Sequence, residues 1–177
     1  LRIALIPVLV AVFYLAPLEW RYLASAAVFT VASVTDWLDG YLARRWGQLT
    51  PFGAFLDPVA DKLIVTTALV VLVQNDPTVI LMAVAAIIIG REITVSALRE
   101  WMSELGAGAR VKVSFFAKWK TTLQMFGIGF LLYQEPSFGL PVYGIGMVLL
   151  IAAAGLTLWS MADYLRSAWP VMRSGIR

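Results

Sequence analysis

Several apolar runs in this chain are long enough, or nearly long enough, to cross a membrane, and they restrict the folds open to it. A helix of about 20 residues spans a bilayer core of about 30 Å. With turn-forming residues at the breaks, the runs occupy residues 3–15, 22–40, 57–73, 78–98, 118–133 and 141–165. Composition agrees, because 60% of the residues are hydrophobic. The sequence therefore predicts an all-α integral membrane protein, built as a bundle of six transmembrane helices.

The length and even composition of the chain suit one compact domain. Residues 1–177 contain no composition shift, low-complexity tract or fixed-period repeat that would mark a second one. The sequence starts at Leu1 rather than Met, so we expect a few residues to precede it. We therefore predict a single transmembrane domain over 1–177, with an incomplete N-terminus.

Basic residues are distributed unequally between the two predicted sides of the membrane. If the six spans alternate in direction, all of the 14 basic residues except Arg21 lie on one side or in the adjoining half of the membrane. Such asymmetry identifies the basic side as cytoplasmic. We expect both termini on that side of a bacterial inner membrane, where the net charge of +3 favours anionic lipid head groups. Nucleic acid is disfavoured as a partner, because the basic residues flank spans instead of forming a soluble basic domain.

Four carboxylates lie where the second and third predicted spans meet the cytoplasmic side: Asp36, Asp39, Asp57 and Asp61. On a helix, the first two share one face with Gly40 and Ala43, because the four positions follow an i, i+3, i+4, i+7 pattern. Gly53 and the last two acids step by four residues, which also places them on one face. A short connection between the helices would bring the two faces together, so we predict a polar active-site cavity that faces the cytoplasm.

The predicted cluster has the chemistry of a site for hard divalent cations. The chain contains no His and no Cys, and carboxylate oxygens without such ligands suit Mg²⁺ or Mn²⁺ better than zinc or copper. Charged groups at membrane depth usually pair, bind ions or line a polar cavity. Two ions held by four carboxylates could hold a diphosphate and stabilise a leaving phosphate. We therefore expect two bound ions and phosphoryl-transfer chemistry.

The spacing of these residues resembles a known family signature. The pattern Asp36-x2-Asp39-Gly40-x2-Ala43-Arg44-x8-Gly53-x3-Asp57-x3-Asp61 is similar to that of the CDP-alcohol phosphotransferases, with every position filled. The resemblance implies an integral membrane enzyme with six transmembrane helices, often a homodimer. Such an enzyme moves a substituted phosphate from a CDP-linked donor to an alcohol and releases CMP.

The same resemblance implies a role for each signature residue. The four aspartates would hold the two ions, and Asp61 would also act as general base. A carboxylate is a weak base, so Asp61 would take the proton as the acceptor hydroxyl attacks. The residues implied to bind the CDP part of the donor, CDP-diacylglycerol, or to leave room for it are Gly40, Ala43, Arg44, Thr50 and Gly53.

Further segments resemble one branch of that family, the bacterial phosphatidylglycerophosphate synthases: residues 90–93, 97–101, 118–122 and 158–161. This similarity implies that the sn-1 hydroxyl of glycerol 3-phosphate receives the phosphatidyl group. The acceptor phosphate needs cations, and Arg91 and Arg99 stand two helical turns apart on nearly one face. Together with Lys118 and Lys120, which open the fifth span, they are the predicted ligands of glycerol 3-phosphate.

Several of these residues also have a purely structural alternative. The pairs concerned are Asp57 and Pro58 as the cap and start of a helix, Asp61 and Lys62 as a surface pair, Arg91 and Glu92 as a stabilising ion pair, and Lys118 and Lys120 as head-group anchors.

Two other functions remain open from the sequence. A different CDP-alcohol phosphotransferase would make phosphatidylserine, an inositol phosphate lipid or cardiolipin. A cation-coupled transporter would also carry acids inside a bundle, but its acids are expected nearer the membrane midplane and within inverted repeats. The identity of the product, or the transport of ions, separates these functions.

Overall fold

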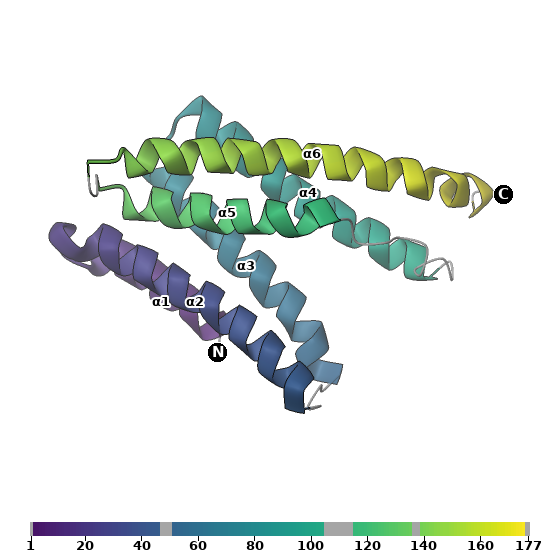
Figure 1. The fold of residues 1–177 in the computed structure, drawn as a ribbon, viewed down its shortest axis with the longest axis horizontal. Coiled ribbons are helices and arrows are strands. Elements are labelled where there is room, and N and C mark those ends of the chain that lie inside the picture. The colour runs from purple at the N-terminus through teal and green to yellow at the C-terminus, as the bar shows by residue number, and fades with distance from the viewer. Residues whose placement is uncertain (1, 47–50, 105–114, 136–138, 176–177) are drawn as a thin grey trace.

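The structure, a computed structural model, describes residues 2–46, 51–104, 115–135 and 139–175, and its elements in these ranges are six helices (Figure 1). They are α1 (Arg2–Leu15), α2 (Leu18–Trp46), α3 (Pro51–Asn75), α4 (Val79–Glu104), α5 (Phe115–Tyr133) and α6 (Val142–Gly175). Each predicted span overlaps one of these helices. The prediction of an all-α fold is therefore confirmed for the described residues.

Two of the described helices are long and apolar enough to cross a membrane. They are α4 and the part of α6 from Val142 to Arg166, each of which contains an 18-residue stretch with a mean hydropathy of 2.0, while Ile3–Leu15 forms a shorter apolar helix. Apolar side chains on their outer surfaces are typical of helices that face lipid. Transmembrane passage of all six helices stays a prediction.

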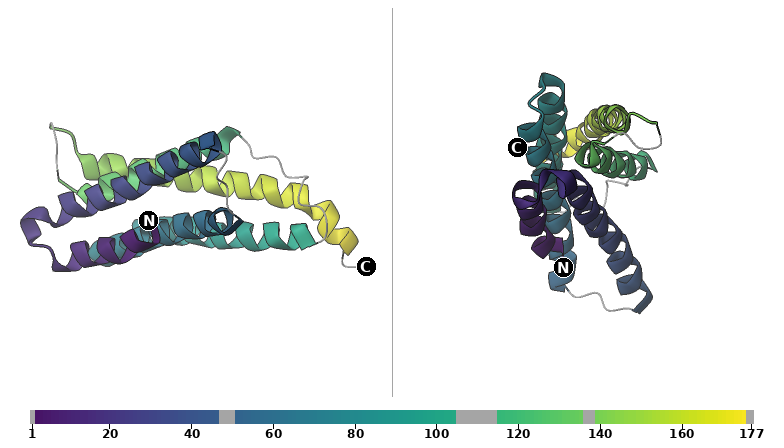
Figure 2. Two further views of the ribbon diagram at one scale, coloured as in Figure 1. Left: turned by 90° about the horizontal axis from the view of Figure 1, so that it is seen from below. Right: turned by 90° about the vertical axis from the view of Figure 1, so that its left-hand side faces the viewer.

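The helices run back and forth between two ends of the bundle. The α1–α2, α3–α4 and α5–α6 turns lie toward the left and top of Figure 1, while the ends of α2, α4 and α6 and the starts of α3 and α5 lie toward the right (Figures 1 and 2). At the end that holds the three turns, two tyrosine hydroxyls connect the helices, because Tyr14 donates to Gln74 and Tyr143 donates to Asp76. The acid-rich segments therefore lie at the end opposite these ties.

One apolar core connects all six helices. It contains one fully buried side chain from each, in chain order Leu9, Phe29, Leu69, Ile88, Ile128 and Leu150. Within this core, α3 packs against α1, α4 and α5. This packing fixes the helix from which two of the predicted metal ligands project.

Helices α5 and α6 approach closely through two glycines. A Cβ on Gly146 would lie 2.9 Å from Cβ of Phe130 and 3.1 Å from the carbonyl oxygen of Gly127. Because small residues let helix backbones come together, this crossing positions α5 against α6. Helix α5 in turn forms one wall of the candidate site described below.

The start of α3 differs from the predicted span. The helix begins at Pro51, six residues before the predicted start, and Pro58 lies inside it. Proline suits the first position of a helix because it has no amide hydrogen to leave unpaired. The alternative in which Asp57 caps the helix is therefore wrong, since Asp57 lies in the second turn of α3.

Candidate active site

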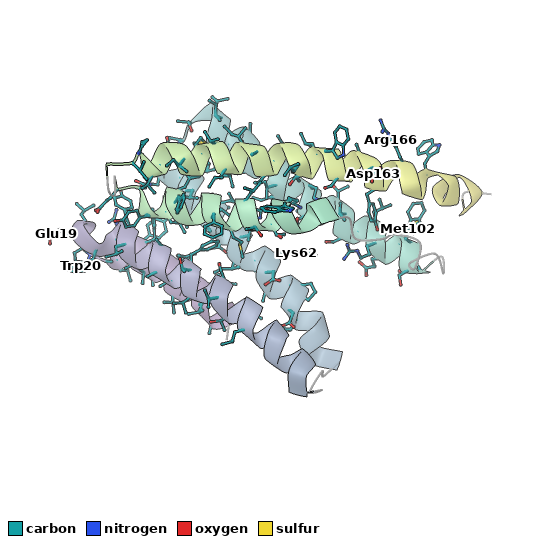
Figure 3. All side chains as sticks on the ribbon, in the orientation of Figure 1. Glu19, Trp20, Lys62, Met102, Asp163 and Arg166 are labelled. Carbon is teal, nitrogen blue, oxygen red and sulfur yellow. The ribbon has the colours of Figure 1, made fainter. Side chains whose placement is uncertain are left out.

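A cavity of about 380 Å³ lies between α3, α4 and α5. Its walls carry charged, polar and apolar side chains: Pro58, Asp61, Lys62 and Val65 from α3, Arg91, Glu92, Val95, Ser96 and Arg99 from α4, and Thr121, Gln124 and Met125 from α5. Figure 3 labels Lys62 on α3, which marks the position of this site in the bundle. We refer to it as the polar cavity.

Two of the four predicted metal ligands have described side chains. Asp61 is half-buried and lines the polar cavity, and Asp57 lies one turn earlier on α3 with an exposed side chain. Asp36 and Asp39 lie on α2, but their side chains fall outside the described set. Among the side chains that are described, no group of three or more acidic residues is gathered for a metal ion. The four-carboxylate cluster therefore stays a prediction.

The predicted donor-binding residues lie mostly outside the described side chains. Gly40, Ala43 and Arg44 belong to the last turns of α2, and only their backbone is described. Thr50 falls outside the described residues, whereas Gly53 is half-buried in the first turn of α3. Their contacts with a donor remain predictions.

Arg91 and Arg99 line the same cavity as Asp61. The two positions are eight residues apart in one helix, so both project from a similar face. Lys118 lies on α5, and its side chain is outside the described set. The structure thus brings two predicted acceptor ligands together with the predicted base.

Glu92 joins two of the predicted basic ligands. Its Oε1 lies 2.6 Å from Nη1 of Arg91 and 3.0 Å from Nζ of Lys120. Lys120 is only 2% exposed and does not line the polar cavity. It pairs with Glu92, which does line it. A buried cation needs such a partner, so the predicted Arg91–Glu92 ion pair is confirmed and extends to Lys120. Direct contact between Lys120 and the acceptor stays a prediction.

Lys62 bridges α3 to α4. Its Nζ donates to Oγ of Ser96 at 2.5 Å, and Oγ of Ser96 donates to the backbone oxygen of Glu92 at 2.6 Å. The alternative in which Asp61 and Lys62 form a surface pair is wrong, because both side chains are half-buried and line the cavity. Lys62 therefore adds a third cation to Arg91 and Arg99.

Two buried polar atoms near the cavity lack hydrogen-bond partners among the described residues. They are Nε of Arg91 and Oε1 of Gln124, and Gln124 as a whole is only 5% exposed. Sequence reasoning missed Gln124, Ser96 and the position of Lys62. A signal for the first two was present, because Gln124 stands four residues after Lys120 and Ser96 four residues after Glu92, on the same helix faces.

A second cavity, of about 850 Å³, lies beside the first. Most of its lining comes from α2 and α5, and much of that is apolar, including Phe29, Val34 and Phe126. Thr121 and Met125 line both cavities, so the two spaces share a wall on α5. We refer to this space as the apolar cavity.

Comparison with known proteins places these features in a family context. A sequence model of CDP-alcohol phosphatidyltransferase matches residues 1–159. A Pseudomonas fluorescens protein named CDP-diacylglycerol–glycerol-3-phosphate 3-phosphatidyltransferase is 54% identical over 177 residues, which cover 98% of this chain and 89% of the relative. Proteins of the same name from Haemophilus influenzae and Escherichia coli K12 are 50% and 51% identical, over 94% of this chain and 88% and 90% of their own lengths.

Proposed function

Because the chain belongs to the CDP-alcohol phosphatidyltransferase family, we propose that it transfers the phosphatidyl group of CDP-diacylglycerol to sn-glycerol 3-phosphate. The products are phosphatidylglycerol phosphate and CMP. This reaction makes the chain a membrane transferase of phospholipid biosynthesis, and it is the reaction in the names of relatives that share half or more of its residues.

The observation that carries this proposal is the content of the polar cavity. One carboxylate, Asp61, faces the same space as Lys62, Arg91 and Arg99. A phosphorylated alcohol needs both kinds of group, because its phosphate is held by cations while its hydroxyl gives up a proton to a base. A transporter would not require a base and three cations in one cavity.

The residues of the cavity divide the work of the reaction. Arg91 and Arg99, with Lys118 and Lys120 at the start of α5, bind the acceptor phosphate. The oxygen of the sn-1 hydroxyl forms a bond to the phosphorus that carries diacylglycerol, and its proton passes to Asp61. The bond between that phosphorus and the phosphate of CMP breaks, and CMP leaves.

The family signature supports a pair of divalent ions, Mg²⁺ or Mn²⁺, held by Asp36, Asp39, Asp57 and Asp61. The described members of this set fit such ions, because Asp57 and Asp61 stand one turn apart on α3 and offer only hard carboxylate oxygens. When bound, the ions would neutralise the diphosphate of the donor and stabilise the charge of the leaving CMP.

The donor is bound by two parts of the protein. Gly40, Ala43, Arg44, Thr50 and Gly53 contact its CDP part or leave room for it. The apolar cavity takes acyl chains from the lipid phase, and its shared wall with the polar cavity supports this division.

The basic-residue asymmetry supports a multi-pass protein of the bacterial inner membrane with six transmembrane helices. Its polar cavity and both termini face the cytoplasm, the source of glycerol 3-phosphate. The chain acts as a single domain and assembles as a homodimer, as the family resemblance implies.

An acceptor panel tests the proposal. Purified protein is incubated with CDP-diacylglycerol and Mg²⁺ together with glycerol 3-phosphate, serine, myo-inositol phosphate or phosphatidylglycerol, and both CMP and the lipid product are measured. We expect CMP and phosphatidylglycerol phosphate with glycerol 3-phosphate alone. A lipid product from another acceptor, with none from glycerol 3-phosphate, would assign the chain to a different branch of its family.

A further inference from the structure

Gln124 lines the polar cavity and carries a buried hydrogen-bond acceptor that has no partner among the described residues. The residue lines the cavity from α5 and is 5% exposed, and its Oε1 has no donor among the described residues. Buried amide oxygens are normally paired, since an unpaired one loses its hydration without replacement. The buried amide therefore needs a donor, and a ligand in the cavity that Gln124 lines can supply one when the amide turns its oxygen toward that space.

Three of the neighbouring cations donate to other acceptors and leave this oxygen open. Nζ of Lys62 donates to Ser96, and Lys120 and Nη1 of Arg91 both donate to Glu92. Nε of Arg91 is a buried donor without a partner among the described residues, and it does not pair with Gln124. The cavity thus combines an unpaired donor on a cation with an unpaired acceptor on a neutral amide.

These two atoms require different groups on one ligand. Phosphate oxygens can accept from Nε of Arg91, but at neutral pH they have little hydrogen to offer the amide oxygen of Gln124. A hydroxyl group can donate to that oxygen. The complementary ligand is therefore a phosphate ester that carries a free hydroxyl besides the one that reacts.

We propose that Gln124 is a specificity-determining residue, whose amide oxygen accepts a hydrogen bond from the sn-2 hydroxyl of glycerol 3-phosphate while Nε of Arg91 donates to the phosphate. This assignment rests on the proposed function. In that reaction the sn-1 hydroxyl gives its proton to Asp61, so the sn-2 hydroxyl is the remaining donor of the acceptor.

The test compares two acceptors, glycerol 3-phosphate and 3-hydroxypropyl phosphate, which lacks only the sn-2 hydroxyl. With the full-length protein, CDP-diacylglycerol and Mg²⁺, we expect kcat/KM to favour glycerol 3-phosphate about tenfold, the effect of one hydrogen bond to a buried partner. Met has a similar volume to Gln but no amide. In Gln124→Met we therefore expect kcat/KM for glycerol 3-phosphate to fall to the value for 3-hydroxypropyl phosphate, while kcat/KM for 3-hydroxypropyl phosphate changes little.

Two further variants separate this role from a purely structural one. Gln124→Glu keeps an acceptor oxygen in either protonation state and is expected to retain most of the preference. Gln134→Met makes the same chemical change just after α5, outside both cavities, and is expected to keep the full preference.

Equal rates for the two acceptors in the unmodified protein would overturn the assignment without any variant. An unchanged preference in Gln124→Met, or an equal loss in the Met and Glu variants, would also overturn it. The failure of the proposed function looks different, because the unmodified protein would then release no CMP with glycerol 3-phosphate.

Discussion

The two cavities share a wall on α5 but differ in chemistry. The polar cavity is lined by Lys62, Arg91 and Arg99 together with Asp61 and Glu92, whereas the apolar cavity is lined mainly by aromatic and aliphatic side chains. Charged groups inside a membrane bundle persist where they pair or line a polar space. Helix α5 thus separates the charged side chains from a space suited to lipid chains, with Thr121 and Met125 at the boundary.

The largest effect is expected from removing the carboxylate of the polar cavity. Asp61→Asn should lower the rate of CMP release about 10²- to 10⁴-fold, because it removes the proposed general base. The same change at Asp163, on α6 outside both cavities, is the matched control and should keep activity. Thermal unfolding in detergent checks that both variants fold. Full activity of Asp61→Asn with Mg²⁺ present would refute the base role.

Breaking the ion-pair network should destabilise the wall of the polar cavity. Glu92→Gln leaves Lys120 buried without its counter-charge. Loss of one partner of a fully buried pair costs about 3–5 kcal/mol, and because the Glu92 side chain is 26% exposed we expect about 2–3 kcal/mol. Glu100→Gln, at an exposed position of the same helix, is the control. We expect a lower unfolding temperature for Glu92→Gln than for Glu100→Gln. Equal unfolding temperatures would exclude a structural role for this network.

Displacing the shared wall should affect the stability of the bundle. A methyl group at Gly146 would approach Cβ of Phe130 to 2.9 Å, so Gly146→Ala forces α5 and α6 apart. We expect a loss of about 1–3 kcal/mol, typical of overpacking. Gly155→Ala on the same helix meets no atom within 4 Å and should be neutral or slightly stabilising. If the two variants unfold at the same temperature, the close crossing does not hold α5 in place.

Filling the apolar cavity should affect the donor alone. Gly129 lines this cavity, and a Cβ added there meets no atom within 4 Å. We expect Gly129→Leu to raise the KM for CDP-diacylglycerol about tenfold, the low end for added bulk in an apolar pocket, and to leave the KM for glycerol 3-phosphate unchanged. Gly155→Leu, outside both cavities, is the control. A change in the acceptor KM instead would show that the two cavities do not divide the substrates.

Local patterns in the sequence were sufficient to predict the helices and several site residues. The apolar runs located the six helices of the described residues, and the eight-residue spacing of Arg91 and Arg99 placed both on nearly one face of α4, from which both line the polar cavity. Such predictions succeed because helix periodicity depends only on neighbours along the chain. The start of α3 was misplaced, because the Asp57–Pro58 pair has the form of a helix start although Pro51 supplies one earlier.

The sequence by itself determined the all-α class, the family and the chemical type of the signature residues. Only the tertiary structure decided which residues surround Asp61. Lys120 pairs with Glu92 across 28 positions, and Lys62 reaches Ser96 across 34. Gln124 meets the cavity only because α5 packs against α3 and reaches α4 through the Lys120–Glu92 pair. The physical reason is that contacts between helices depend on how they pack around the common core, whereas the pattern within one helix records its face and not its neighbour.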